Sequence, residues 1–326
     1  MHPAMKSFVV LLALANLFQT TAAIAQADDY PRRVVRMISP NAPGSSNDTL
    51  GRILGAKLGE VLGQQVIIEN QAGASGLIAM ENLKNAQADG YTIIAASPSG
   101  VSIAPLLQKR MPYDPLNDFQ FVSLVAELPN MLVVTPSLPV RTVQELIDYC
   151  KARPGQINMA SAGPGSQSHL AGVMLQLAGN FTSVHVPYKG GGPSVASVMS
   201  GESHWTFTPA SSTVGPVRAG RLRAVAHSLP KRTPLLEGIP AVAETLPGFS
   251  YSAWVGVLVP KATPLPVAEK LRAALLKTVA LPDVREGFGK QGAEVSTDTP
   301  EEFREMVRAE IENMRKVVKA ADLKIE

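Results

Sequence analysis

The residues best suited to chemistry lie early in the chain, between positions 39 and 52. There the sequence reads Ser-Pro-Asn-Ala-Pro-Gly-Ser-Ser-Asn-Asp-Thr-Leu-Gly-Arg. An apolar run at 34–38 precedes this segment and predicts a strand, and apolar residues spaced by three and four follow it to position 62 and predict a helix. Main-chain N–H groups and the helix dipole both favour an anion at a helix start. The segment therefore predicts a ligand site that includes Ala42, Gly44, Ser45, Ser46, Asn47 and Asp48.

The sequence of this loop indicates which kinds of anion it can bind. It contains neither G-x-x-x-x-G-K-[ST] nor G-x-G-x-x-G, so a nucleotide phosphate is not the favoured ligand. The carboxylate of Asp48 would repel an anion, but pairing with Arg52, four residues further on, would turn it away. A structural role is therefore the favoured alternative for Asp48.

Loops of small residues recur after predicted strands in both halves of the chain, at 73–76, 97–100, 161–168 and 189–192. Each alone is typical of ordinary turns. Their recurrence favours a shared ligand site, because loops at the carboxyl ends of strands in an open α/β sheet lie along one edge. The candidate ligand-binding residues here are Ser97, Ser99, Gly100, Ser161, Gly165, Ser166, His169, Tyr188 and Gly190.

For His169 and for four aromatic residues, the sequence leaves two roles open. His169 lies in the first turn of a predicted helix, where it either contacts a ligand or serves in packing and capping. The aromatic residues Tyr188, Trp205, Tyr251 and Trp254 fall near predicted loops or a hinge, where they either fill the core or form a pocket wall.

Motifs for catalysis are missing from the sequence. There is no G-x-S-x-G, and Ser228-Leu-Pro-Lys231 matches S-x-x-K without the partner motifs of that enzyme class. The five histidines have no metal-binding spacing. We therefore predict no enzymatic activity, no catalytic residues, no metal and no cofactor.

Composition and the first residues indicate an exported globular protein. The chain has 326 residues, 45% of them hydrophobic and 17% charged, with a formal charge of +3 and no long basic run, so nucleic acid is not an expected partner. Residues 1–27 resemble a signal peptide, with cleavage after Ala25 or Ala27. The single cysteine, Cys150, allows no internal disulfide, which favours a bacterial periplasm.

The predicted elements form two successive β-α-β blocks, which indicates an α/β fold with two lobes. Strand-like runs at 121–127 and 131–135, separated at Pro129, and a strand at 251–259 are the predicted crossings between lobes. We therefore divide the chain into a signal peptide at 1–27, a first lobe at 28–127, a second lobe at 128–252, and a return to the first lobe at 253–326.

Spaced motifs along nearly the whole chain resemble the periplasmic solute-binding receptors of tripartite tricarboxylate transporters, the Bug receptors. These motifs are Pro40-x-Ala-Pro-Gly44 with Asp48 and Arg52, Val66-Ile-Ile-Glu-Asn70, Ala88-Asp-Gly-Tyr-Thr92, Ser161-Ala-Gly-x-Gly-Ser166, Val186-Pro-Tyr-Lys-Gly190, Gly220-Arg-Leu-Arg-Ala224 and Trp254-x-Gly256.

The resemblance implies a type II-like, Venus-flytrap fold that closes on a small organic carboxylate and delivers it to a membrane permease. The expected ligand is a di- or tricarboxylate or an aromatic acid, and the expected state is a monomer. The resemblance also implies that residues 42–48 and 97–100 hold a ligand carboxylate through main-chain amides and bridging waters.

Two positions depart from the family pattern. Ser45 follows Gly44 where the family usually has a second glycine, so a side chain lies where the main chain should approach the ligand. His204 stands where the family usually has an acidic residue. If His204 borders the cleft, we expect a dicarboxylate or an aromatic acid to be preferred over an amino acid.

Two other functions fit the same sequence. An exported α/β hydrolase acting on small acids would need a nucleophile and base that the motifs do not supply. A sensory receptor that presents its ligand to a membrane kinase would share the fold.

Overall fold

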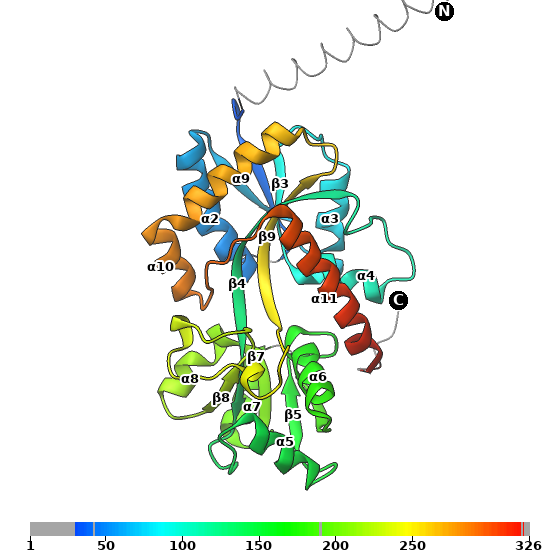
Figure 1. The fold of residues 1–326 in the computed structure, drawn as a ribbon, viewed down its shortest axis with the longest axis vertical. Coiled ribbons are helices and arrows are strands. Elements are labelled where there is room, and N and C mark those ends of the chain that lie inside the picture. Colours follow the sequence, from blue (N-terminus) through cyan, green and yellow to red (C-terminus); the bar gives the residue numbers. More distant parts are fainter. Residues whose placement is uncertain (1–29, 42, 189–190, 321, 323–326) are drawn as a thin grey trace, which may run out of the picture.

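The computed structural model describes residues 30–41, 43–188, 191–320 and 322. These residues form an elongated molecule of two lobes connected by long strands (Figure 1). The strands follow the order β2-β1-β3-β9-β4-β7-β5-β6, with β8 also paired to β4. The predicted signal peptide lies outside the described residues.

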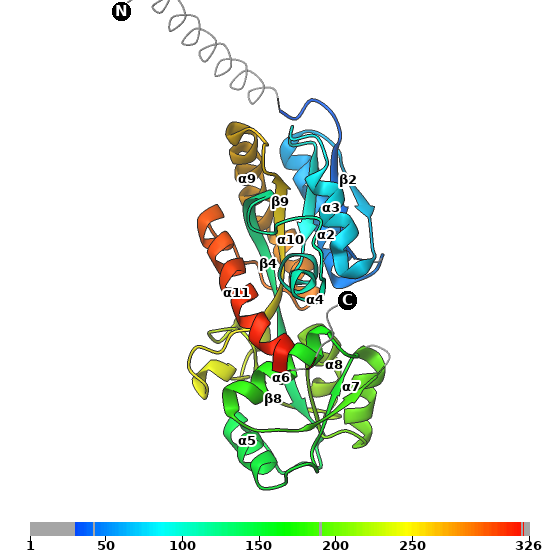
Figure 2. The same cartoon turned by 90° about the vertical axis from the view of Figure 1, so that its right-hand side faces the viewer.

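The first lobe is a five-stranded sheet with helices on both faces. Its parallel strands are β1 (Val35–Ser39), β2 (Val66–Asn70) and β3 (Thr92–Ala96). Helices α2 (Ser46–Leu62), α9 (Leu265–Ala280) and α10 (Pro282–Lys290) share one apolar core over this sheet. Helix α3 (Leu77–Lys84) and the first half of α11 (Pro300–Ala320) cover the opposite face (Figure 2).

The second lobe repeats this layered plan. Its strands are β5 (Asn158–Ser161), β6 (Val184–Pro187), β7 (Trp205–Pro209) and β8 (Arg223–His227). Helices α5 (Val143–Lys151) and α6 (Gln167–Gly179) pack on one face, and α7 (Gly191–Ser200) and α8 (Val214–Arg218) lie on the other. The α/β fold with two similar lobes is as predicted.

Two long strands cross between the lobes. Strand β4 (Phe119–Val134) runs without interruption through Pro129, and β9 (Ser252–Pro260) lies antiparallel to it. The predicted break at Pro129 is therefore wrong. Pro129 is the last β4 residue paired with β9, and Asn130 is the first paired with β7, so the proline lies where the strand changes partners.

Helix α11 contacts both lobes. It begins with a capping box, in which Glu302 N donates to Thr299 Oγ1 at 3.2 Å and Thr299 N donates to Glu302 Oε2 at 2.9 Å. Phe303 and Val307 pack in the first lobe, whereas Met314 and Val317 belong to the core of the second. The boundary that we set for 253–326 therefore needs correction, because the end of α11 packs against α6 (Figure 1).

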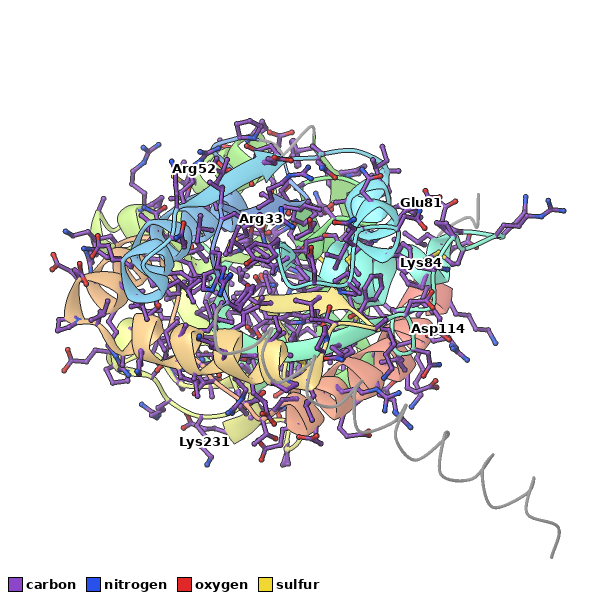
Figure 3. All side chains as sticks on the ribbon, turned by 90° about the horizontal axis from the view of Figure 1, so that it is seen from above. Arg33, Arg52, Glu81, Lys84, Asp114 and Lys231 are labelled. Atoms are coloured by element: carbon purple, nitrogen blue, oxygen red, sulfur yellow. The ribbon has the colours of Figure 1, made fainter. Side chains whose placement is uncertain are left out.

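Charged side chains lie mainly on the outside of this fold. Viewed from above, Glu81, Lys84 and Lys231 lie at the rim of the molecule (Figure 3). Within the described residues, no helix is both long and apolar enough to span a bilayer.

Candidate functional site

A cavity of about 440 Å³ lies between the lobes. Loops of the first lobe, the start of α6 in the second lobe and both crossing strands contribute to its wall. The lining residues are Asn41, Ser45, Ser46, Asn47, Ser97, Pro98, Ser99, Ile103, Leu107, Leu128, Pro164, Gly165, Ser166, Gln167, Pro209, Tyr251, Ala253, Trp254 and Val255. Its size is in the range of small-molecule sites.

The start of α2 forms the first-lobe end of the cavity. Ser45 is the N-cap, and its Oγ accepts from Asp48 N at 3.2 Å. Asn47 is held by two strands, because its Nδ2 donates to the Ala95 carbonyl at 3.2 Å and its Oδ1 accepts from Ser39 Oγ at 3.3 Å. The first N–H groups of the helix have no intrahelical partner, so those of Ser46 and Asn47 are available to a ligand in the cavity.

Asp48 supports this loop without lining the cavity. Its carboxylate accepts from Gly44 N at 2.8 Å, from Asn70 Nδ2 at 2.7 Å and from Arg52 Nε at 3.0 Å. Burial by itself would raise the pKa of Asp48, but these hydrogen bonds outweigh it and lower the pKa. The structure thus gives Asp48 the structural arrangement that the sequence favoured, with Gly44 in a left-handed conformation at φ 79°.

The start of α6 repeats this arrangement from the second lobe. Ser166 is its N-cap, with φ −67° and ψ 158° against −67° and 160° at Ser45. Its Oγ accepts from His169 N at 3.3 Å. Gln167 then occupies the first helical position, as Ser46 does in α2, and lines the cavity from the opposite side.

His169 takes the packing and capping role. Its Nδ1 accepts from Gly165 N at 3.1 Å, and its ring stacks on His185 at 3.9 Å. Burial and the neighbouring His185 lower the pKa of His169 to about 4, so it is neutral at neutral pH. Ser161, also predicted as a ligand residue, is buried and bonds His185 Nε2 at 2.6 Å. Neither residue lines the cavity.

Three buried polar atoms of the cavity wall have no hydrogen-bond partner among the described residues. They are Asn41 Oδ1, Ser97 Oγ and Gln167 Nε2. Ser97 is only 9% exposed. Buried polar groups are normally paired, so these atoms favour a bound ligand with hydrogen-bonding groups at this place.

The rest of the wall is largely apolar. Trp254 faces the cavity while its Nε1 donates to Glu310 Oε2 at 3.0 Å, and Ser102 Oγ donates to the same oxygen. Tyr251 also lines the cavity, in line with the pocket-wall role considered for both aromatic residues. Trp205 is instead buried and donates to Ser183 Oγ at 3.0 Å.

Several predicted residues lie elsewhere. His204 does not border the cavity: its Nδ1 accepts from Asn158 N at 2.8 Å just before β7 begins, whereas Pro209 at the other end of β7 lines the cavity. His204 therefore gives no reason to expect a dicarboxylate or an aromatic acid to be preferred over an amino acid. Tyr188 contacts Ser203 Oγ at 3.2 Å, and Gly100 is buried beside α3, so neither is part of the wall. Ala42 and Gly190 lie outside the described residues.

Sequence reasoning missed several lining residues. Asn41 stood within the opening segment, and Gln167 follows the Gly-Ser loop, so both could have been found from their positions at helix starts. Ile103, Leu107 and Val255 also line the cavity. The sequence does not reveal this role, because apolar residues that line a cavity have the same pattern as apolar residues in a core.

The described part of the chain contains no cluster of three His, Cys, Asp or Glu side chains placed to hold a metal. In the S-x-x-K match, Ser228 is buried and its Oγ accepts from Asn130 N at 2.9 Å, while Lys231 is exposed.

A cavity between two α/β lobes, joined by crossing strands and bounded by two helix starts, defines a solute-binding protein of the two-lobed class. Residues 50–323 match the family model described as the tripartite tricarboxylate transporter family receptor. The chain belongs to this family, whose members are periplasmic binding receptors.

The chain matches individual relatives over almost their full length. Protein BugT of Bordetella pertussis is 34% identical over 97% of this chain and 98% of its own. The structure of Rpa4515 of R. palustris with adipate has a TM-score of 0.72 at 33% identity, covering 91% of this chain and 99% of that one. MatC of Rhodopseudomonas palustris with bound malate has a TM-score of 0.70 at 30% identity, covering 89% and 100%.

Proposed function

We propose that this protein is a periplasmic receptor that captures one small carboxylate between its lobes and delivers it, chemically unchanged, to a membrane permease of the tripartite tricarboxylate type. It acts as a monomer after removal of a signal peptide that ends at Ala25 or Ala27. The observation that carries the proposal is the pair of serine-capped helix starts, α2 and α6, that line one cavity from opposite lobes.

The ligand carboxylate lies at the start of α2 in this proposal. There the main-chain N–H groups of Ser46 and Asn47 and the hydroxyl of Ser97 supply donors. The adipate and malate bound by two relatives support a carboxylate as the ligand class. Bending of β4 and β9 near residues 125–131 and 250–256 would close the lobes over the ligand.

A carboxylate placed at Ser46 tests this proposal directly. Ser46 is exposed at the first position of α2, so Ser46→Asp should stabilise the helix by about 0.3–1 kcal/mol through the dipole. The same charge would repel an anionic ligand, so the dissociation constant should rise roughly 10- to 100-fold. Thermal unfolding measures the first effect, and calorimetric titration with adipate and malate measures the second.

Ser46→Asn is the matched control, because it has nearly the same shape without the charge. It should change the affinity by no more than about threefold, since a single exposed neutral substitution has a small effect. Equal acid binding by the Asp and Asn variants would contradict a carboxylate site at α2. Measured turnover of the bound acid would contradict a receptor without catalysis.

A further inference from the structure

The cavity wall carries no ionised side chain among its described residues. Three acidic side chains near the wall have hydrogen-bond partners of their own. Glu127, which precedes the lining residue Leu128 in β4, is partly buried and accepts from Ser252 Oγ at 3.0 Å. Asp48 is held by Gly44, Asn70 and Arg52, and Glu310 contacts Ser102 and the outer edge of the Trp254 indole. A ligand ammonium group would therefore find no carboxylate partner in this wall.

Polar and apolar groups are separated within the cavity. The unpartnered hydrogen-bond donors are Ser97 Oγ at the first-lobe end and Gln167 Nε2 at the second-lobe end. The crossing strands and the segment after Ser99 add the apolar side chains of Ile103, Leu107, Leu128, Trp254 and Val255 to the wall, together with Tyr251, whose hydroxyl donates to the Gln167 carbonyl at 3.4 Å. Such a wall matches a ligand with polar ends and an apolar middle.

We propose that this cavity selects a dicarboxylate with an unsubstituted hydrocarbon body over hydroxy acids and amino acids of the same length. This selectivity rests on the receptor function proposed above. One carboxylate lies at α2 with Ser97, and the second accepts a hydrogen bond from Gln167 Nε2 at the start of α6. The hydrocarbon body contacts the aromatic and aliphatic wall.

The physical basis of this selectivity is the free-energy cost of burying a polar group of the ligand without a hydrogen-bond partner. A hydroxyl on the ligand body would leave water and face Leu107, Leu128 or Val255, none of which can hydrogen-bond it through its side chain. An ammonium group is costlier still, since it is charged and lacks a counter-ion in the wall. A ligand body of plain methylene groups gives up no hydrogen bond to water when it enters the cavity. Its burial adds apolar contact area, which favours binding.

Matched six-carbon acids provide the test. Titration calorimetry of the full mature chain should give a dissociation constant for adipate that is about 10-fold lower than for 2-hydroxyadipate. For 2-aminoadipate, which adds a charge, we expect binding weaker by about 100-fold or more. These acids differ from one another in a single substituent, so the ratios isolate the effect of the ligand body.

Gln167 variants identify the second carboxylate. Gln167→Glu keeps the shape and adds a negative charge, so adipate should bind about 10-fold more weakly or worse. Hexanoate, which has the same body and one carboxylate, should lose no more than about threefold in the same variant because its carboxylate lies at α2. Gln167→Met, which removes the amide without adding charge, should weaken adipate by about fivefold or more.

The outcomes separate the two proposals. Equal or tighter binding of 2-hydroxyadipate or 2-aminoadipate, with Ser46→Asp still weakening it, would overturn the selectivity and leave the receptor function standing. Equal loss of adipate and hexanoate in Gln167→Glu would overturn the second carboxylate position. Failure of every acid to bind would contradict the receptor function itself.

Discussion

Replacing Gly256 by alanine is expected to destabilise the native state by about 3 kcal/mol, at the upper end of the usual cost of overpacking. A Cβ at this position in β9 would lie 2.1 Å from Cζ and 2.6 Å from Cε1 of Phe303. The Phe303 ring is fully buried, and the rings of Phe121 and Trp254 pack against it edge-on, with ring centroids 5.1 and 5.2 Å away. The Phe303 ring therefore cannot easily move. Chemical denaturation measures the change in the free energy of unfolding.

Two companion variants make this prediction specific. Gly289→Ala in α10 meets no atom within 4 Å and should be stabilising by about 0.5–1 kcal/mol, as expected for a helical glycine. Combining Gly256→Ala with Phe303→Leu should cost less than the sum of the two single changes, because the shorter side chain relieves the overlap. Strictly additive costs would show that the contact is not the cause.

Replacing Glu310 by glutamine is expected to stabilise the protein at pH 8 by on the order of 2 kcal/mol relative to its effect at pH 5. Burial raises the pKa of Glu310 to about 7, although hydrogen bonds from Ser102 and Trp254 oppose the rise. The native state therefore holds a proton that the unfolded chain releases near pH 4.5. Stability from this group is present below about pH 4.5 and is lost as the pH rises towards 7.

The glutamine variant keeps an acceptor for Ser102 and Trp254 but cannot ionise, so it should lack this loss. The measured quantity is the difference in unfolding free energy between variant and wild type from pH 5 to 8, because histidines also titrate in this range. Glu312→Gln, exposed on the same helix, should leave that difference within about 0.5 kcal/mol of zero. A flat difference for Glu310→Gln would contradict a raised pKa of Glu310 in the native state.

Local signals in the sequence indicate where several elements begin and end. The helix starts at Ser45 and Thr299 follow from short-range capping, and Gly63 ends α2 in the left-handed conformation that glycine favours. These contacts span three or four residues, so they can be read without knowing the fold. The two successive β-α-β blocks indicated two lobes, and the family resemblance implied the type II-like arrangement that closes on a ligand.

What the sequence left open depends on contacts between distant segments. Pro129 reads as a strand breaker, and only the change of partner from β9 to β7 explains why β4 continues through it. His204 lies at the end of β7 away from the cavity, which no local pattern reveals. Tyr251 and Trp254 form the wall because β9 crosses between the lobes, so their role required the topology.

The contact of α11 with both lobes has a consequence for folding. Residues 135–251 form a continuous insertion between β4 and β9, which by chain order alone looks like an excisable domain. Yet its core includes Met314 and Val317, which come from the far end of the chain. Excision would expose that apolar surface to water. We therefore expect the two lobes to unfold together, because the core of the second lobe is complete only when the last helix is in place.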